Sequence, residues 1–188
     1  MSAIAKLSVA EYERIVATGV FDGPNGRRIE LIWGELREMS PIGSEHATIV
    51  DWLTEWSVDN APRDQARVRV QNAVTFLPED SEPQPDIVWA RRQNYAERHP
   101  AANEILLLIE VADSSLENDR CEKARLYATA GVMDYWIVNL IDSTVEVRRD
   151  SKDGRHRSVQ SFAAGAAIQS LAVPELQLGV DLLFGSLV

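Results

Sequence analysis

The sequence Glu104-Ile-Leu-Leu-Leu-Ile-Glu110-Val-Ala112 is a nearly continuous apolar run that carries one acidic residue near its end. Such a run predicts a strand that is buried on both faces. A buried carboxylate without a partner is very unfavourable, so Glu110 requires a compensating group. Upstream, Pro85-Asp86-Ile-Val-Trp-Ala90 places a second carboxylate at the start of another apolar strand. Two carboxylates on consecutive strands predict a shared cation.

The segment after this run predicts a helix over about Leu116–Ala130, which Gly131 ends. Within it, Asp119, Lys123 and Tyr127 are spaced by four residues and therefore lie on one helix face. A carboxylate, a second carboxylate and a lysine in this order outline a metal-dependent phosphodiesterase site.

The rest of the chain alternates strand and helix patterns. We expect hairpins at Arg28–Ile32/Glu35–Ser40 and Thr144–Arg149/Arg157–Phe162, helices at Ser44–Asn60 and near Arg92–Glu97, an alternating strand from Val68 to Phe76, and a central strand at Met133–Leu140. This mixed order predicts an α/β (α+β) fold with a central mixed β-sheet flanked by helices. No long linker divides the chain, so we expect residues 1–188 to form a single domain.

The composition indicates a soluble globular protein, with 188 residues, 45% hydrophobic and 26% charged. No apolar run is long enough to span a membrane, and the first residues lack the apolar core of a signal peptide. Cys121 is the single cysteine, which excludes an internal disulfide. These features predict a cytoplasmic protein without a membrane partner.

The net charge of −10 opposes nucleic-acid binding, which requires Lys and Arg to displace counterions. Basic residues nevertheless cluster locally. The clusters are Arg63, Arg67 and Arg69; Arg91 and Arg92; and Arg148, Arg149, Lys152, Arg155 and Arg157. Each cluster taken alone is typical of solvated strand and loop surface.

An ordered set of motifs resembles the PD-(D/E)XK nuclease superfamily and, more closely, the Uma family of bacterial proteins described as "putative restriction endonucleases". The resemblance runs from about Leu7 to about Phe184. The matching residues are Ile29-Glu-Leu-Ile-Trp-Gly-Glu-Leu36, Met39-Ser-Pro41, His46, Pro85-Asp86, Leu108-Ile-Glu-Val111, Ser114-Ser115, Asp119, Lys123, Tyr127-Ala128, Ala130-Gly-Val132 and Tyr135-Trp136-Ile-Val138.

The resemblance implies a restriction-endonuclease-like core and a Mg²⁺-dependent (or Mn²⁺-dependent) endonuclease that hydrolyses DNA. Asp86 and Glu110 are suited to bind the metal, because Mg²⁺ prefers a few carboxylates and water. The resemblance adds the backbone carbonyl of Val111 as a ligand and Glu30 as a further acid near the metal. Lys123 would stabilise the charge of the transition state or orient the attacking water.

One position departs from the simplest superfamily pattern, in which the lysine stands two residues after the second acid. That position is Ala112 here. Lys123 on the following helix must then supply the ammonium, which depends on how the helix packs over the strand.

Most candidate residues also have a structural interpretation, whereas Glu110 has none within its apolar run except at a sheet edge. Asp86 could cap the entry to its strand, Lys123 could pair with Asp119 on a helix surface, and Glu30 could pair with an arginine across its hairpin. Tyr127 is equally compatible with the core, and a histidine at a helix start, such as His46, is more often structural.

A second hypothesis is a non-catalytic, dimeric regulatory protein that keeps the nuclease fold and binds nucleic acid or another protein. The acidity and the absence of room for a target-recognition domain favour it. For either function we expect a homodimer, because the late hairpin, the Trp52/Trp56 helix face and the apolar tail offer much hydrophobic surface.

Overall fold

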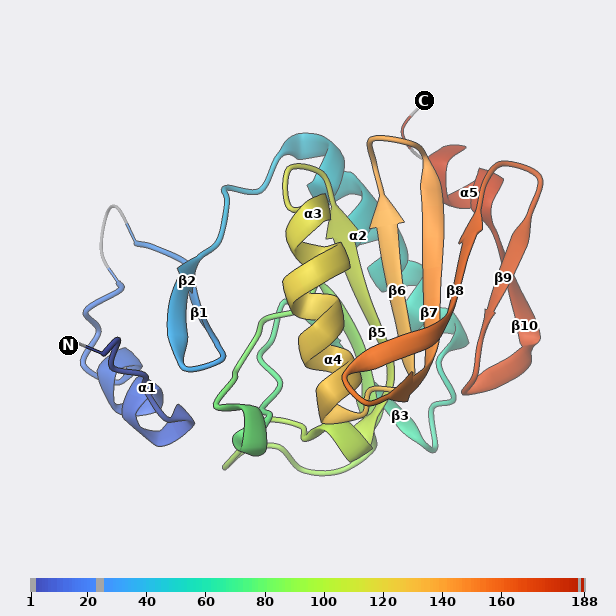
Figure 1. Cartoon of the computed structure of the whole chain (residues 1–188). Coiled ribbons are helices and arrows are strands. Elements are labelled where there is room, and N and C mark those ends of the chain that lie inside the picture. The colour runs from blue at the N-terminus through green and yellow to red at the C-terminus, as the bar shows by residue number, and fades with distance from the viewer. Residues whose placement is uncertain (1–2, 23–25, 186, 188) are drawn as a thin grey trace.

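A computed structural model describes residues 3–22, 26–185 and 187 of the chain. Within them, a central six-stranded sheet has the strand order β3-β4-β5-β6-β7-β8 (Figure 1). Its strands are β3 (Ala66–Val70), β4 (Ile87–Arg91), β5 (Ile105–Ala112), β6 (Asp134–Asn139), β7 (Thr144–Lys152) and β8 (Arg155–Phe162). The pair β5 and β6 is parallel and the other neighbouring pairs are antiparallel. The expected α/β (α+β) class with a central mixed sheet is therefore confirmed.

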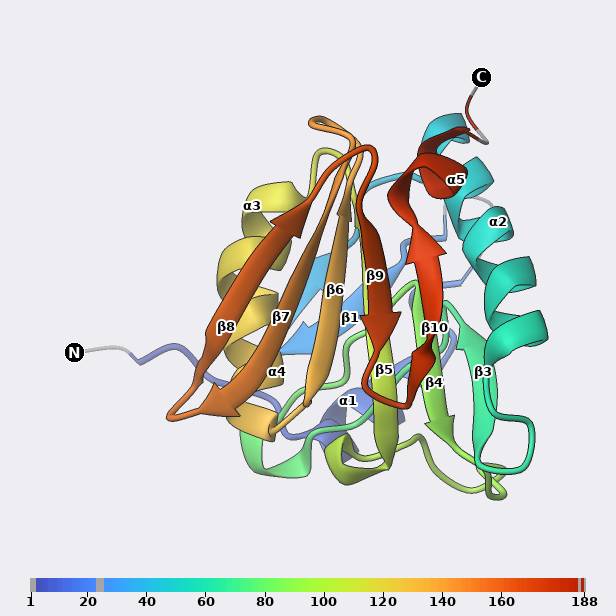
Figure 2. The ribbon, with the colours of Figure 1, turned by 90° about the vertical axis from the view of Figure 1, so that its right-hand side faces the viewer.

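Helices cover both faces of this sheet (Figure 2). One face carries α2 (Ser44–Asn60), the hairpin β9 (Ala167–Ser170)–β10 (Val173–Gly179) and α5 (Val180–Gly185). The other face carries α3 (Leu116–Asn118), the π-helical turn η3 (Asp119–Lys123) and α4 (Ala124–Ala130). A third group consists of α1 (Val9–Val16) and the hairpin β1 (Ile29–Ile32)–β2 (Glu35–Glu38), and short 3₁₀ turns lie at Leu77–Glu79 and Ala102–Glu104. In the described ranges, no helix combines the length and apolar character needed to cross a membrane.

Side chains of β5 alternate between two cores. Ile109 and Val111 pack toward α2, whereas Leu108 and Ala112 pack toward α4. Since alternate residues of a strand share a face, Glu110 points to the α4 side. In β4, Val88 and Ala90 also pack on that side, so Asp86, two residues before Val88, points to the same face. The sheet therefore directs both predicted carboxylates to the face that α4 covers.

The expectation of one continuous strand from Val68 to Phe76 is wrong. The strand β3 ends at Val70, and Gln71 adopts a left-handed φ of 49°. This kink sends Phe76 into the core beneath α4, whereas Val68 packs on the α2 side. The alternation of apolar residues was real, but it continued through a bend that changes the face.

The short helix expected near Arg92–Glu97 is also absent from the structure. Here the Asn94 side chain accepts a hydrogen bond from the Ala96 N–H, a local bond that competes with helix formation. The guanidinium groups of Arg69 and Arg98 each lie 5.4 Å from the centre of the Tyr95 ring. The other expected elements are confirmed, with one change inside the helix after β5 that is described below.

The hairpin β1–β2 is held against the segment that leads into β4. The main chains of Leu31 and Glu82 exchange hydrogen bonds of 3.4 and 2.7 Å, and the Ser81 hydroxyl accepts from the Trp33 N–H at 2.7 Å. Main-chain bonds of this kind fix the register between the two segments. They place the hairpin at the same end of the sheet as Asp86.

The buried carboxyl of Glu82 should make stability depend on pH. Burial raises the pKa of Glu82 to about 7, while a hydrogen bond from Thr75 opposes the rise. Because the folded state keeps a proton that the unfolded state releases, this group lowers the free energy of unfolding as pH rises from about 4.5 to about 7. We expect Glu82→Gln to raise that free energy by about 2 kcal/mol near pH 8 and to change it little near pH 4.

Urea denaturation across this pH range measures the effect. Glu97→Gln, which removes an exposed carboxyl, is the matched control and should leave the pH profile unchanged. Parallel wild-type and Glu82→Gln profiles would contradict the prediction.

Candidate active site

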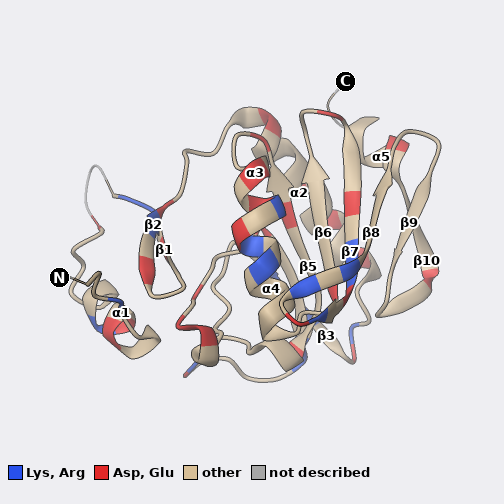
Figure 3. Ribbon diagram, in the orientation of Figure 1, with Lys and Arg blue, Asp and Glu red and all other residues tan. Residues whose placement is uncertain are grey.

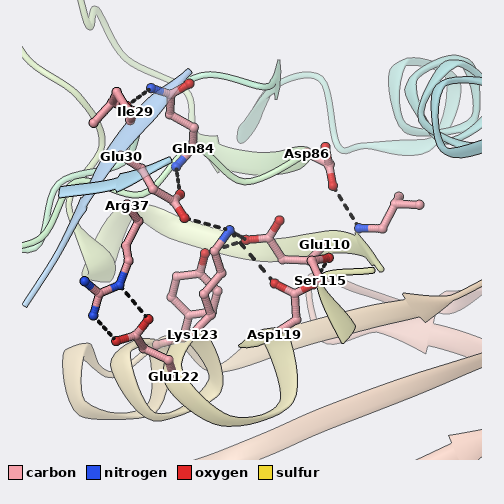
Figure 4. A network of polar contacts seen from close by, with 12 residues as sticks. Ile29, Glu30, Arg37, Gln84, Asp86, Glu110, Ser115, Asp119, Glu122 and Lys123 are labelled. Carbon is pink, nitrogen blue, oxygen red and sulfur yellow. Dashed lines mark hydrogen bonds and ion pairs between the residues drawn. The ribbon is translucent and has the colours of Figure 1, made fainter. Parts of the chain in front are cut away.

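A pocket of about 330 Å³ lies between five parts of the fold. They are the start of β4, the end of β5, the β1–β2 hairpin, the start of α2 and η3. All of the residues that the sequence predicted for a site line it, namely Glu30, Asp86, Glu110, Val111 and Lys123. Figure 4 shows the side chains of Glu30, Glu110 and Lys123 meeting from separate elements, with Asp86 nearby. The expected convergence of these residues at one end of the sheet is therefore present.

Asp86 is held from three sides immediately before β4. Its Oδ2 accepts the Val111 N–H at 2.9 Å and lies 3.2 Å from His46 Nε2, and its Oδ1 accepts from Gln71 Nε2 at 3.1 Å. Burial acts to raise the pKa of Asp86, but the contacts with His46, Val111 and Gln71 outweigh it and the pKa is lowered. Asp86 is therefore ionised and fixed in orientation.

Glu110 has the opposite electrostatic character. Its Oε1 accepts from Lys123 Nζ at 3.1 Å and from the Tyr127 hydroxyl at 2.6 Å. Burial, with the nearby charges of Asp119, Asp86 and Glu30, raises the pKa of Glu110 to about 8 although Lys123 opposes this. Negative charge at Glu110 is thus under-compensated, which favours binding of an additional cation.

Lys123 is the ammonium at the centre of the cluster. Its Nζ lies 3.1 Å from Glu110 Oε1, 3.4 Å from Glu30 Oε1 and 3.9 Å from Asp119 Oδ1. Burial acts to lower the pKa of Lys123, but these three carboxylates outweigh it and the pKa is raised. Lys123 is charged at neutral pH, so it can stabilise negative charge but cannot serve as a general base.

The helix that carries Lys123 contains the π-helical turn η3, where the sequence predicted a regular α-helix. The Ala124 N–H reaches back to the carbonyl of Asp119, and the same carbonyl accepts from the Tyr135 hydroxyl at 3.1 Å. Turns of this kind are rare and frequent at functional sites. From this helix Lys123 and Tyr127 donate to Glu110, and Asp119 lies 3.9 Å from Lys123 Nζ.

Glu30 reaches the cluster from β1. Its Oε2 accepts the Gln84 N–H at 3.2 Å, while Gln84 Nε2 donates to the Ile29 carbonyl. Arg37 lies opposite Glu30 in the register of the hairpin, but it forms ion pairs with Glu122 and Glu35 instead. The structural alternative for Glu30, an arginine partner across its hairpin, is therefore not realised.

Asp119 is the member of the cluster that was not among the predicted site residues. It is 2% exposed, its Oδ2 accepts from the Ser115 hydroxyl at 2.6 Å, and its Oδ1 is buried without a hydrogen-bond partner among the described residues. Burial, aided by Asp86 and Glu30, raises the pKa of Asp119. Its spacing of four from Lys123 was the available signal, but that spacing is equally typical of a surface ion pair.

Three further residues, Tyr127, His46 and Gln71, contact carboxylates of the cluster. Tyr127 is fully buried and donates to Glu110, so it belongs both to the core and to the site. His46, at the start of α2, contacts Asp86, and this contact raises the pKa of His46 although burial opposes it. Gln71 could not be anticipated, because it reaches Asp86 only through the kink after β3.

The donor set fits a hard divalent cation. The carboxylates of Glu30, Asp86, Glu110 and Asp119 line one pocket with a single lysine, and the main chain of Val111 lies beside Asp86. Such oxygen donors are those that Mg²⁺ prefers. In the described residues, no three acidic, His or Cys side chains are already gathered at metal-ligand distance. A cation would therefore complete its shell with main-chain oxygen and water, as Mg²⁺ usually does.

Comparisons with known proteins agree with this fold. A solved structure, that of "a putative nuclease belonging to DUF820" from Anabaena variabilis ATCC 29413, is similar to this chain with a TM-score of 0.75. The two share 18% sequence identity, and the match covers 97% of this chain and 99% of the other. At this identity the similarity shows the fold alone.

The sequence itself supplies the family. No curated protein matches the chain. The model of the Uma2 family, described as "Putative restriction endonuclease", matches residues 9–181. Because this match spans nearly the whole sequence, the chain belongs to the Uma2 family.

Proposed function

We propose that this protein is a Mg²⁺-dependent endonuclease that hydrolyses DNA phosphodiester bonds. The observation that carries the proposal is the convergence of Asp86, Glu110 and the charged Lys123 in one pocket. The family description and the solved structure of similar fold, described as "a putative nuclease", support a nuclease function.

The roles follow from the charges and contacts of the residues. Asp86, Glu110 and the Val111 carbonyl would hold Mg²⁺ or Mn²⁺, with Glu30 as an additional acid beside them. The bound ion would supply an activated water and neutralise charge on the phosphate oxygens. Lys123 keeps its ammonium beside Glu110, where it would stabilise the negative charge that the transition state gains. His46 and Gln71 fix the orientation of Asp86.

Cleavage should depend strictly on a divalent cation. We expect Mg²⁺ or Mn²⁺ to support nicking of plasmid, linear or single-stranded DNA, and EDTA to abolish it. The cation alone should bind weakly and raise the melting temperature, because it relieves repulsion among the four carboxylates. Gel assays and calorimetry measure the two effects. Metal binding without cleavage of any substrate would favour the non-catalytic, dimeric regulatory protein instead.

The homodimer also remains a proposal. Trp56 stacks on Trp89 at 5.6 Å inside the chain, and the tail residues Ile168, Leu178 and Leu183 are buried in the core. The late hairpin remains available for pairing, since β8 is an edge strand of the central sheet and exposes Val159. Light scattering at micromolar concentrations tests this, and a monomer mass throughout would count against it.

A further inference from the structure

A hollow of about 750 Å³ lies between the C-terminal end of α4 and the turn that joins β7 to β8, outside the candidate active site. Its lining includes Arg125, Lys152 and Arg155, with Ser151 and Gly154 beside them. Figure 3 shows Lys and Arg on the helix and on the nearby parts of β7 and β8. In a chain of net charge −10, a hollow with three cations is a distinct local environment.

These three cations differ from their neighbours in having no carboxylate partner within the described residues. Other arginines of the same region have carboxylate partners, because Arg120 and Arg148 share Glu146, and Arg149 pairs with Asp134. The one acidic side chain that lines the hollow, Asp153, lies 3.5 Å from Arg157. The hollow is thus left with an excess of uncompensated positive charge.

The hollow is connected to the candidate active site through shared residues. A small intermediate pocket is lined by Arg37 and Glu122, which also line the active-site pocket, and by Arg125, which also lines the hollow. Arg125 lies over the ring of Trp33 at 5.6 Å. The three depressions therefore follow one path along the exposed side of α4.

The spacing along this path suits a nucleic-acid strand. Lys123 and Thr129 are six residues apart on η3–α4, which corresponds to about 9 Å of helix rise. That length is close to two or three base-pair steps of a duplex, at about 3.4 Å each. An extended polyanion could thus contact the hollow and the active-site pocket at the same time.

We propose that this hollow binds the phosphate backbone of the nucleic acid whose cleavage is proposed above, a few nucleotides away from the scissile bond. The inference rests on the proposed function for the identity of the partner. Lys152 and Arg155 would act by charge, without base recognition, so they would contribute affinity and position the strand.

A structural role for these cations is the competing explanation. The end of α4 carries the negative end of a helix dipole, which nearby cations offset. If the cations serve only to stabilise the helix end, removing them should lower the melting temperature and leave DNA binding unchanged.

The test compares two double variants that each remove two exposed positive charges. Lys152→Gln/Arg155→Gln changes the hollow, and Arg63→Gln/Arg67→Gln changes exposed residues at and just before β3, the far edge of the sheet. Binding is measured by fluorescence anisotropy in EDTA, with a labelled duplex of about 20 base pairs and its single strand, between about 50 and 200 mM NaCl. Melting temperatures are recorded in parallel.

We expect the hollow variant to bind several-fold to about tenfold more weakly, and its salt dependence to fall by about one to two units in log–log slope. The control variant should match the wild type, and both variants should melt normally. Equal losses in both variants, no loss in the hollow variant, or no binding by the wild type to either probe would overturn the inference.

The outcome also separates this inference from the proposed function. If binding depends on the hollow but the protein never cleaves DNA, the proposed nuclease activity is rejected and the hollow is supported as a nucleic-acid-binding site. If the wild type cleaves DNA but its binding does not depend on Lys152 and Arg155, the nuclease activity is supported and the role of the hollow is rejected.

Discussion

Asp86→Asn and Glu110→Gln should each abolish DNA cleavage while leaving the fold intact. Each change removes one negative charge from the pocket that is proposed to hold the divalent cation. Electrostatic stabilisation by a bound metal amounts to several kcal/mol, and about 1.4 kcal/mol corresponds to a tenfold change in rate. We therefore expect losses of at least about 100- to 1000-fold in a plasmid-nicking assay, together with weaker metal binding by calorimetry.

The two variants should differ in stability, which distinguishes their environments. Asp86 is stabilised as a carboxylate by His46, Val111 and Gln71, so Asp86→Asn should lower the free energy of unfolding modestly. Because folding raises the pKa of Glu110, its charge destabilises the native state at high pH, and Glu110→Gln should raise stability there in EDTA. Wild-type cleavage by the Asp86→Asn variant would remove the proposed mechanism altogether.

Lys123→Met should have the largest effect on stability in the molecule. The substitution keeps a long apolar side chain of similar volume but leaves Glu30, Glu110 and Asp119 without their shared ammonium. Breaking a buried ion pair by removing one partner costs about 3–5 kcal/mol. We expect a loss of this size in EDTA at neutral pH, a smaller loss near pH 4 where the carboxyls take up protons, and partial recovery in Mg²⁺.

Cleavage by this variant should be absent even where Mg²⁺ restores the fold, because the charge directed at the transition state is missing. Urea denaturation with and without Mg²⁺, followed by the nicking assay on the refolded protein, measures both effects. Lys6→Met, which removes a half-exposed lysine that pairs with Glu35, is the matched control and should change neither. Full activity of Lys123→Met would show that the lysine is only a structural counterion.

Local patterns predicted the sheet and the two acidic residues well. The strands β4, β5 and β6 are almost entirely apolar in their interiors, so their burial and the need of Glu110 for a partner followed from the local sequence pattern. Local patterns could not predict that Lys123 lies beside Glu110, because this depends on how the helix after β5 packs over the end of that strand. No spacing within the sequence expresses that tertiary relation, whereas the family resemblance did.

The failures have a common physical origin. The kink at Gln71 and the π-helical turn η3 are deviations from regular backbone, and periodicity assumes regular backbone. Both deviations lie beside the carboxylates: one directs Gln71 to Asp86, and the other contains Asp119. Departures from local rules are expected to gather at functional sites, where the geometry of the site competes with intrinsic preference.

The π-helical turn makes residue count, as well as residue identity, a determinant of the site. A π turn corresponds to one residue more than a regular helix would need between fixed points. Removing one residue such as the exposed Cys121 would let the helix become regular, and Asp119 and Lys123 would then be three residues apart instead of four. Both side chains would still lie on one helix face, but their positions relative to each other and to Glu110 would change. A length change at a surface position that touches no carboxylate of the cluster would thus alter the distances within the cluster, so alignments of related chains should be gap-free between Ser115 and Tyr127 wherever the cluster is kept.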